Sequence, residues 1–111
     1  MSGITTHVLD TARGRPAANV GIWLEHLSPA GWSKVGAGST DADGRLRTLT
    51  GTTIPAGEYR LHFDTRGYFQ AQGAKAFYPE AVVHFEITDP AEHFHVPLLL
   101  SPWSFSTYRG S

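Results

Sequence analysis

Histidine is the residue type whose side chain titrates closest to neutral pH, so the six histidines are the first candidates for chemistry. His93 and His95 flank a single phenylalanine, and side chains along a strand repeat every two residues, so both imidazoles are expected on one face. Such a pair can bind zinc if a third ligand such as His7 joins it. It can equally supply a catalytic histidine with a neighbour. The spacing alone leaves both interpretations open.

The other histidines have simpler interpretations. His62 and His84 fall on the polar phase of alternating segments, which favours solvated side chains on a sheet surface. His26 ends an expected strand beside a loop. By alternation alone, His7 is also more often a surface histidine than a catalytic one.

Two arginines stand in unusual surroundings. Arg45 directly follows the turn signal Asp43-Gly44, and its simplest interpretation is a cation at a strand edge. Arg109 belongs to a final segment, Ser104 to Ser111, of mostly small, hydroxyl and guanidinium groups. Chain ends are usually poorly ordered. An alternating aromatic segment leads into these last residues, however, so the sequence also allows them to pack against the rest of the protein.

The elements that must position these residues are short strands. Apolar and polar residues alternate over brief segments that are separated by Gly, Pro and Asp, the pattern of a sandwich or barrel. Thr65 is expected to N-cap a brief helix that runs to about Gln70. About eight strands are expected, over residues 4–10, 20–25, 33–40, from 45, 59–64, 82–87, 93–100 and 103–108.

Composition excludes several classes of protein. The 111 residues form one expected domain, 1–111, in which 41% hydrophobic residues suffice for a core. A net charge of −1 without a basic stripe argues against nucleic-acid binding. The absence of cysteine excludes disulfides, thiolate nucleophiles and Cys-ligated zinc. No segment predicts a membrane span or a signal peptide, so a cytoplasmic location is expected. Only 17% charged residues, with three Trp, hint at apolar surface covered by another subunit.

Three stretches, which together run through the whole chain in order, resemble one known family, the 5-hydroxyisourate hydrolases, also called transthyretin-related proteins. The ending Tyr108-Arg109-Gly110-Ser111 is the most specific, because it separates the hydrolases from the hormone-carrying transthyretins. The stretches are Thr6-His7-Val8-Leu9-Asp10-Thr11 through Gly14-Arg15-Pro16-Ala17, then Thr40-Asp41-Ala42-Asp43-Gly44-Arg45, and His95-Val96-Pro97-Leu98-Leu99-Leu100-Ser101-Pro102 running to Ser111.

The resemblance implies an all-β fold, the transthyretin-like (prealbumin-like) β-sandwich of two four-stranded sheets with one short helix. It also implies a homotetramer, a dimer of dimers, whose active sites open onto a channel between the dimers. The reaction implied is hydrolysis of the lactam ring of 5-hydroxyisourate, a small-molecule substrate from urate breakdown, to 2-oxo-4-hydroxy-4-carboxy-5-ureidoimidazoline. Neither a metal nor another cofactor is implied.

The resemblance also assigns site residues. The histidines would perform acid–base catalysis, the arginine would bind and stabilise the anionic substrate, and the last serine with its terminal carboxylate would orient a histidine or water. His93 is not carried over as catalytic. The implied catalytic residues are His7, Arg45, His95 and Ser111, and the implied substrate-binding residues are His7, Arg45, Tyr108, Arg109 and Gly110. If their strands belong to one sheet, alternation allows His7, Arg45, His95 and Tyr108 to share its outer face.

Other functions compete with this reading. A ligand carrier using the same channel would not need two imidazoles and an arginine. A secreted β-sandwich that binds protein or carbohydrate is disfavoured by the missing disulfides and signal peptide. A metal-dependent hydrolase on His7, His93 and His95 is a variant of the enzyme hypothesis, which elemental analysis of purified protein would separate.

Overall fold

The computed structural model describes residues 3–51 and 54–111, which form nine strands and one helix. Most strands coincide with the alternating segments, as the sequence predicts. The elements are β1 (Gly3–Asp10), β2 (Arg15–Pro16), β3 (Gly21–Ser28), β4 (Gly31–Ser39), β5 (Arg45–Leu46), β6 (Gly57–Phe63), α1 (Thr65–Gln70), β7 (Ala81–Ile87), β8 (His93–Leu100) and β9 (Phe105–Thr107).

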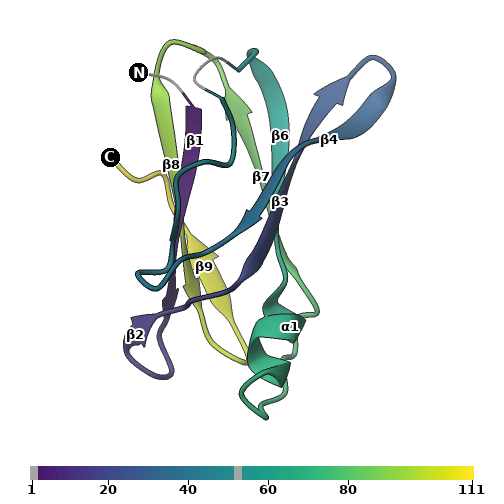
Figure 1. Cartoon of the computed structure of the whole chain (residues 1–111). Coiled ribbons are helices and arrows are strands. Elements are labelled where there is room, and N and C mark those ends of the chain that lie inside the picture. The colour runs from purple at the N-terminus through teal and green to yellow at the C-terminus, as the bar shows by residue number, and fades with distance from the viewer. Residues whose placement is uncertain (1–2, 52–53) are drawn as a thin grey trace.

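The strands form a sandwich of two sheets (Figure 1). One sheet has the order β4-β3-β6-β7, and the other has the order β2-β1-β8-β9 with β5 also paired to β1. The expected two-sheet sandwich with one helix is confirmed, but the second sheet has five strands rather than four. The fifth is Arg15–Pro16, which lies outside the strand ranges that the sequence predicts and which pairs with Leu9 and Asp10. β5 pairs farther along the same edge of β1, at Thr6 and His7, so the two short strands share that edge.

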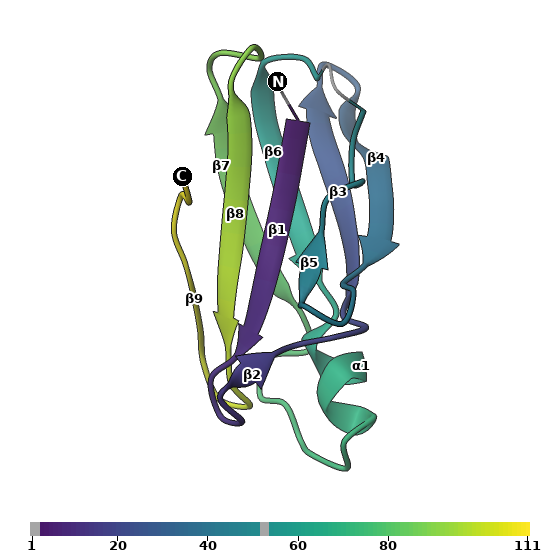
Figure 2. The ribbon, with the colours of Figure 1, turned by 60° about the vertical axis from the view of Figure 1, so that its left-hand side comes forward.

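One strand pair joins the two ends of the sequence. β1 and β8 run parallel and stay in register from Gly3 opposite His93 to Asp10 opposite Leu100. Figure 2 shows them side by side, with β5 beyond β1 and β9 beyond β8. The first and last parts of the chain therefore meet in one sheet.

The core lies between the sheets and follows the predicted alternation. Val20, Ile22 and Leu24 from one strand region are buried, as are Leu61 and Phe63 from the next strand of that sheet. Burying one such side chain contributes roughly 1.5–3 kcal/mol, which gives each strand a fixed inner and outer face. Because the apolar residues of a strand occupy its inner face, the polar residues that alternate with them are turned away from the core.

Helix α1 closes one end of the sandwich. Its N-cap is Asp64, whose side chain accepts a hydrogen bond from the backbone N–H of Gly67 at 2.9 Å. The prediction of Thr65 as the cap is wrong by one residue, because the Thr65 hydroxyl instead donates to the carbonyl of Tyr78. Across residues 3–51 and 54–111, the structure has no helix with the length and apolar character needed to cross a membrane.

Candidate active site

Two histidines and an arginine stand on the outer face of the five-stranded sheet. Thr5 of β1 lies opposite His95 of β8, and His7 of β1 lies opposite Arg45 of β5. Paired residues share one face of a sheet, so these side chains are turned away from the core. Their neighbours in the opposite phase are buried: Val8, Leu46 and Val96. The condition set by the sequence, that the strands of His7, Arg45 and His95 and the strand before Tyr108 belong to one sheet, is met.

The turn before β5 positions Arg45. The Oδ1 atom of Asp41 accepts hydrogen bonds from the backbone N–H groups of Asp43 at 2.9 Å and Arg45 at 3.0 Å. The Arg45 N–H is the main cause that holds the pKa of Asp41 below its usual value. Gly44 has a φ of 75°, and a Cβ there would lie 2.4 Å from the carbonyl oxygen of Val8. Glycine is therefore required where this turn packs on β1.

The same turn orients His7. The Nε2 atom of His7 lies 3.0 Å from the backbone carbonyl oxygen of Asp43. A carbonyl oxygen only accepts hydrogen bonds, so Nε2 must carry a proton. In the neutral ring Nδ1 is then unprotonated and able to accept a proton. One turn thus holds both members of the His7–Arg45 pair.

A cavity of about 340 Å³ lies beside these residues. It brings together three of the residues that the sequence assigned to the site, Arg45, His95 and Ser111. His7 is not among the lining residues, although it is paired with Arg45 in the sheet. The complete lining is Thr5, Thr6, Arg45, Arg47, His93, His95 and Ser111.

Two charged or titratable lining residues, Arg47 and His93, are not among the predicted site residues. Both stand two positions from a predicted one, in Arg45-Leu46-Arg47 and in His93-Phe94-His95. Side chains two apart on a strand share a face. The family resemblance assigned Arg45 and His95, and the two-residue spacing to Arg47 and His93 was the signal in the sequence that these neighbours belong to the same surface.

His95 lies in an environment that disfavours its charged form. Partial burial is the main cause that lowers the pKa of His95 below 6.5, and the positive charge of Arg45, together with that of His7 or His93 whenever those rings are protonated, lowers it further. Removing an imidazolium from water costs free energy, and nearby cations repel it. The ring is therefore neutral at neutral pH and able to accept a proton.

The end of the chain folds back against His95. The backbone N–H of Gly110 donates to the carbonyl oxygen of His95 at 2.8 Å, which extends the β8–β9 pairing by one bridge. A Cβ at position 110 would lie 2.6 Å from Cδ2 of the His95 ring. Close approach of the backbone to the ring therefore needs glycine, and it places Ser111 in the cavity.

Tyr108 and Arg109 line a different cavity, of about 270 Å³, which His95 also borders and which β7 residues line as well. Arg109 donates to Glu92 at 2.9 Å, and its guanidinium lies 4.6 Å from the centroid of the Phe94 ring. Within one chain, these two residues do not line the cavity of Arg45 and Ser111. Arg109 instead anchors the tail that carries Gly110 and Ser111.

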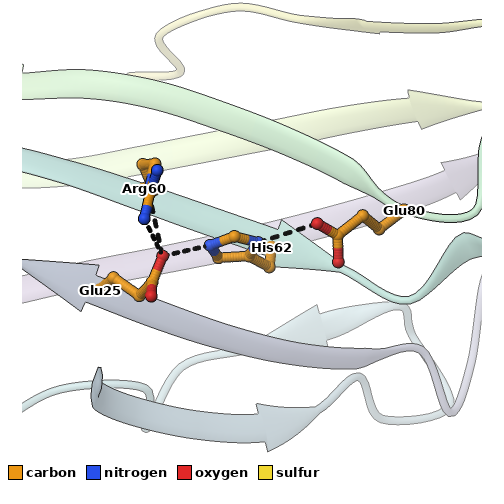
Figure 3. Close-up of polar contacts among 4 residues, drawn as sticks. All are labelled: Glu25, Arg60, His62 and Glu80. Carbon is orange, nitrogen blue, oxygen red and sulfur yellow. Dashed lines mark hydrogen bonds and ion pairs between the residues drawn. The ribbon is translucent and has the colours of Figure 1, made fainter. Parts of the chain in front are cut away.

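His62 is not the solvated surface residue that its polar phase indicated. Only 8% of the residue is exposed, because Trp23 stacks flat on the ring at a centroid distance of 4.7 Å. Its ring nitrogens contact Glu25 at 2.5 Å and Glu80 at 3.3 Å, as Figure 3 shows. The hydrogen bond from His62 is the main cause that lowers the pKa of Glu25. This cluster belongs to the four-stranded sheet and takes no part in the cavity described above.

The histidines beside the cavity are engaged with a hydroxyl group. Nε2 of His93 and Nδ1 of His95 lie 2.9 and 2.8 Å from Oγ1 of Thr5. Among residues 3–51 and 54–111, no three His, Asp or Glu side chains are arranged to hold a metal ion. A metal-free site stays a prediction that elemental analysis of the purified protein would test.

Comparison with known proteins identifies closely similar sequences. The profile of the HIUase/transthyretin family matches residues 4–110. The 5-hydroxyisourate hydrolase of Mus musculus is 47% identical over 113 residues, which cover 99% of this chain and 96% of the mouse protein. The 5-hydroxyisourate hydrolase of Caulobacter vibrioides is 42% identical, with 100% of both chains covered.

Solved structures share the fold. The 5-hydroxyisourate hydrolase of Klebsiella pneumoniae superposes with a TM-score of 0.89 at 35% identity, covering 100% of both chains. Transthyretin from Sparus aurata superposes with a TM-score of 0.91 at 34% identity, covering 99% of this chain and 97% of that one. The fold alone therefore does not distinguish an enzyme from a carrier, and the site must do so.

Proposed function

Because the chain belongs to the HIUase/transthyretin family, we propose that it hydrolyses the lactam ring of 5-hydroxyisourate to 2-oxo-4-hydroxy-4-carboxy-5-ureidoimidazoline. The observation that carries the proposal is that His7, Arg45 and His95 lie on one outer sheet face. His7 is opposite Arg45 on β5, and Thr5, two residues before His7, is opposite His95 on β8. A channel for an apolar hormone needs no such set of imidazole and guanidinium groups. A polar, anionic ring that must be attacked by water does need them.

The reaction requires proton transfer at two points. The oxygen of a water molecule adds to the ring carbonyl carbon, the carbon–nitrogen bond breaks, and the departing nitrogen takes up a proton. His7 and His95 would accept the proton from water and return one to the nitrogen. Positioned acid–base groups of this kind accelerate such steps by about 10²- to 10⁴-fold.

Arg45 would bind the substrate and stabilise charge on the attacked carbonyl oxygen. Its guanidinium presents a rigid fork of donors that matches a planar ring bearing several carbonyl groups. One donor directed at a developing oxyanion stabilises the transition state by roughly 3–4 kcal/mol. Arg47, which lines the same cavity, adds a second positive charge near the substrate.

The last residues would complete the site. The oxygen atoms of Ser111 lie where they can orient a histidine or the attacking water, because Ser111 lines the cavity with His95. Arg109 and Gly110 would contribute to substrate binding mainly by holding Ser111 in place, and Tyr108 would stack on or hydrogen-bond the substrate ring. The anchors are the Arg109–Glu92 ion pair and the Gly110–His95 hydrogen bond.

A direct assay tests the proposed activity. 5-Hydroxyisourate is generated in situ from urate, and the decay of its near-UV absorption is followed with and without the protein. The decay is expected to accelerate in proportion to protein concentration. The same amount of heat-denatured protein is the control, and equal decay rates in the native and denatured samples would exclude the hydrolase.

The pH dependence of hydrolysis should reflect His95. Because the pKa of His95 is below 6.5, its neutral form persists as the pH falls through 6.5. The acidic limb of the profile of kcat/KM is therefore expected below pH 6.5, with activity lost as the pH falls through the lowered pKa of His95. NMR titration of the His95 ring gives an independent value. An acidic limb that does not coincide with the pKa of His95 measured by NMR would contradict the assignment of His95 as proton acceptor.

We also propose that four chains assemble as a dimer of dimers around these sites. β7 and β9 are end strands of their sheets, and unpaired strand edges favour association. Phe77 and Trp103 are 65% and 66% exposed, with ring centroids 6.5 Å apart, so a large aromatic surface is left uncovered in one chain. Such patches mark interaction sites.

Light scattering coupled to size exclusion is expected to give the mass of a tetramer. The tetrameric fraction should carry the hydrolase activity, because the outer sheet face forms an enclosed site only when another subunit covers it. A monomer with full turnover would contradict this arrangement.

A further inference from the structure

Thr5 lies between two imidazole rings. Its Oγ1 atom is 2.9 Å from Nε2 of His93 and 2.8 Å from Nδ1 of His95. The register of β1 and β8 explains this position, because Thr5 lies opposite His95 and His93 lies opposite Gly3. Gly3 has no side chain, so the His93 ring has room to approach Thr5. Three side chains on the outer face thus form a continuous line.

The direction of these two hydrogen bonds decides what His95 can do. A threonine hydroxyl has one proton, so it can donate to only one of the two rings. If Thr5 donates to Nδ1 of His95, the neutral ring carries its proton on Nε2 and presents a donor. If Thr5 accepts from Nδ1–H, Nε2 is unprotonated and presents an acceptor. Nε2 is the ring nitrogen of His95 that Thr5 leaves free.

We infer that Thr5 accepts a hydrogen bond from Nδ1–H of His95 and donates to Nε2 of His93, and so acts as a positioning residue that keeps Nε2 of His95 available as a proton acceptor. The inference rests on the proposed hydrolase function, in which this acceptor receives the proton of water. His93 is exposed, so in the inferred arrangement solvent can accept from its Nδ1–H while its Nε2 accepts from Thr5. The tail at Gly110 passes close to the Cδ2 side of the His95 ring, where an added Cβ would lie 2.6 Å from Cδ2.

Nitrogen NMR of the labelled histidine rings tests the inference directly. In the wild-type protein His95 is expected to show a protonated Nδ1 and an unprotonated Nε2. Thr5→Val keeps the β-branched shape but removes the hydroxyl, so the two His95 tautomers should mix. The kcat is expected to fall by about 10- to 100-fold, by analogy with the hydrogen-bond partners that orient metal-binding histidines. KM should change little because Arg45 is untouched, and Thr5→Ser should restore both the tautomer and the rate.

Thr11→Val is the matched control. The Thr11 hydroxyl donates to the carbonyl of Leu100 at the other end of the same strand pair, 3.1 Å away, so its removal should leave the His95 tautomer and kcat unchanged. If Thr5→Val does not fold, His93→Ala removes the acceptor for the Thr5 proton at an exposed position and should weaken the same tautomer preference.

Two outcomes are distinguishable. If Nδ1 of His95 stays protonated and Nε2 unprotonated in Thr5→Val, the role of Thr5 would be overturned, even if the activity of the variant falls. The same result in His93→Ala would overturn it if Thr5→Val does not fold. A wild-type protein without hydrolase activity would overturn the proposed function, while the NMR result would still decide the hydrogen-bond directions.

Discussion

Replacing His95 or His7 with alanine is expected to lower the rate of 5-hydroxyisourate hydrolysis by about two orders of magnitude or more, because each change removes a positioned acid–base group. Both side chains are turned to the outer face and are only half-buried, so their removal leaves no cavity in the core. The unfolding midpoint and the circular dichroism spectrum should therefore stay close to those of the wild type. The loss should appear in kcat more than in KM.

His26→Ala is the matched control for these variants. His26 is a histidine on the other sheet, where it stacks on Tyr59 with ring centroids 4.6 Å apart, and it lines neither of the cavities that His95 borders. Its removal is expected to leave hydrolysis unchanged. Near-normal kcat in a well-folded His7→Ala or His95→Ala protein would remove that residue from the mechanism.

Changes at the end of the chain are expected to reduce catalysis while barely changing stability. Deleting residues 109–111, or adding a tag after Ser111, would remove or displace the group that lines the cavity beside Arg45 and His95. A hydrogen bond to a charged group is worth about 1.5–3 kcal/mol, so kcat should fall roughly 10- to 100-fold. The Arg109–Glu92 pair is exposed and contributes about 0–1 kcal/mol to folding, so the melting temperature should change little.

Gly110→Ala gives a sharper form of this test. The new Cβ would lie 2.6 Å from Cδ2 of His95, so either the tail or the imidazole must move, and the rate should fall as in the deletion. At Gly51 an added Cβ meets nothing within 4 Å, so Gly51→Ala is the control that adds the same methyl group. A tagged enzyme and a Gly110→Ala enzyme that both match the wild type in kcat and KM would show that the tail has no part in the site.

The local sequence pattern determined the faces of the strands and the turn before Arg45. Alternation in the sequence predicted the buried faces of the main core strands, and it placed His7 and His95 on the polar face before any strand pairing was known. The Asp43-Gly44 signal predicted the turn that holds Arg45, and the structure adds why glycine is required there. These features follow from the two-residue repeat of a strand and from the backbone freedom of glycine, which act over a few neighbouring residues.

The tertiary structure decided which strands pair, and therefore which side chains come together on one face of a sheet. Nothing in the alternation shows that β1 pairs in parallel with β8, which places Thr5 opposite His95 although they are 90 residues apart. The burial of His62 under Trp23 and the pairing of Arg109 with Glu92 likewise depend on neighbours from distant segments. A strand's own sequence sets the face on which a side chain stands, because that depends on local geometry alone. Its partners across the sheet are set by packing of the whole chain, and so the contacts that define the site exist only in the folded protein.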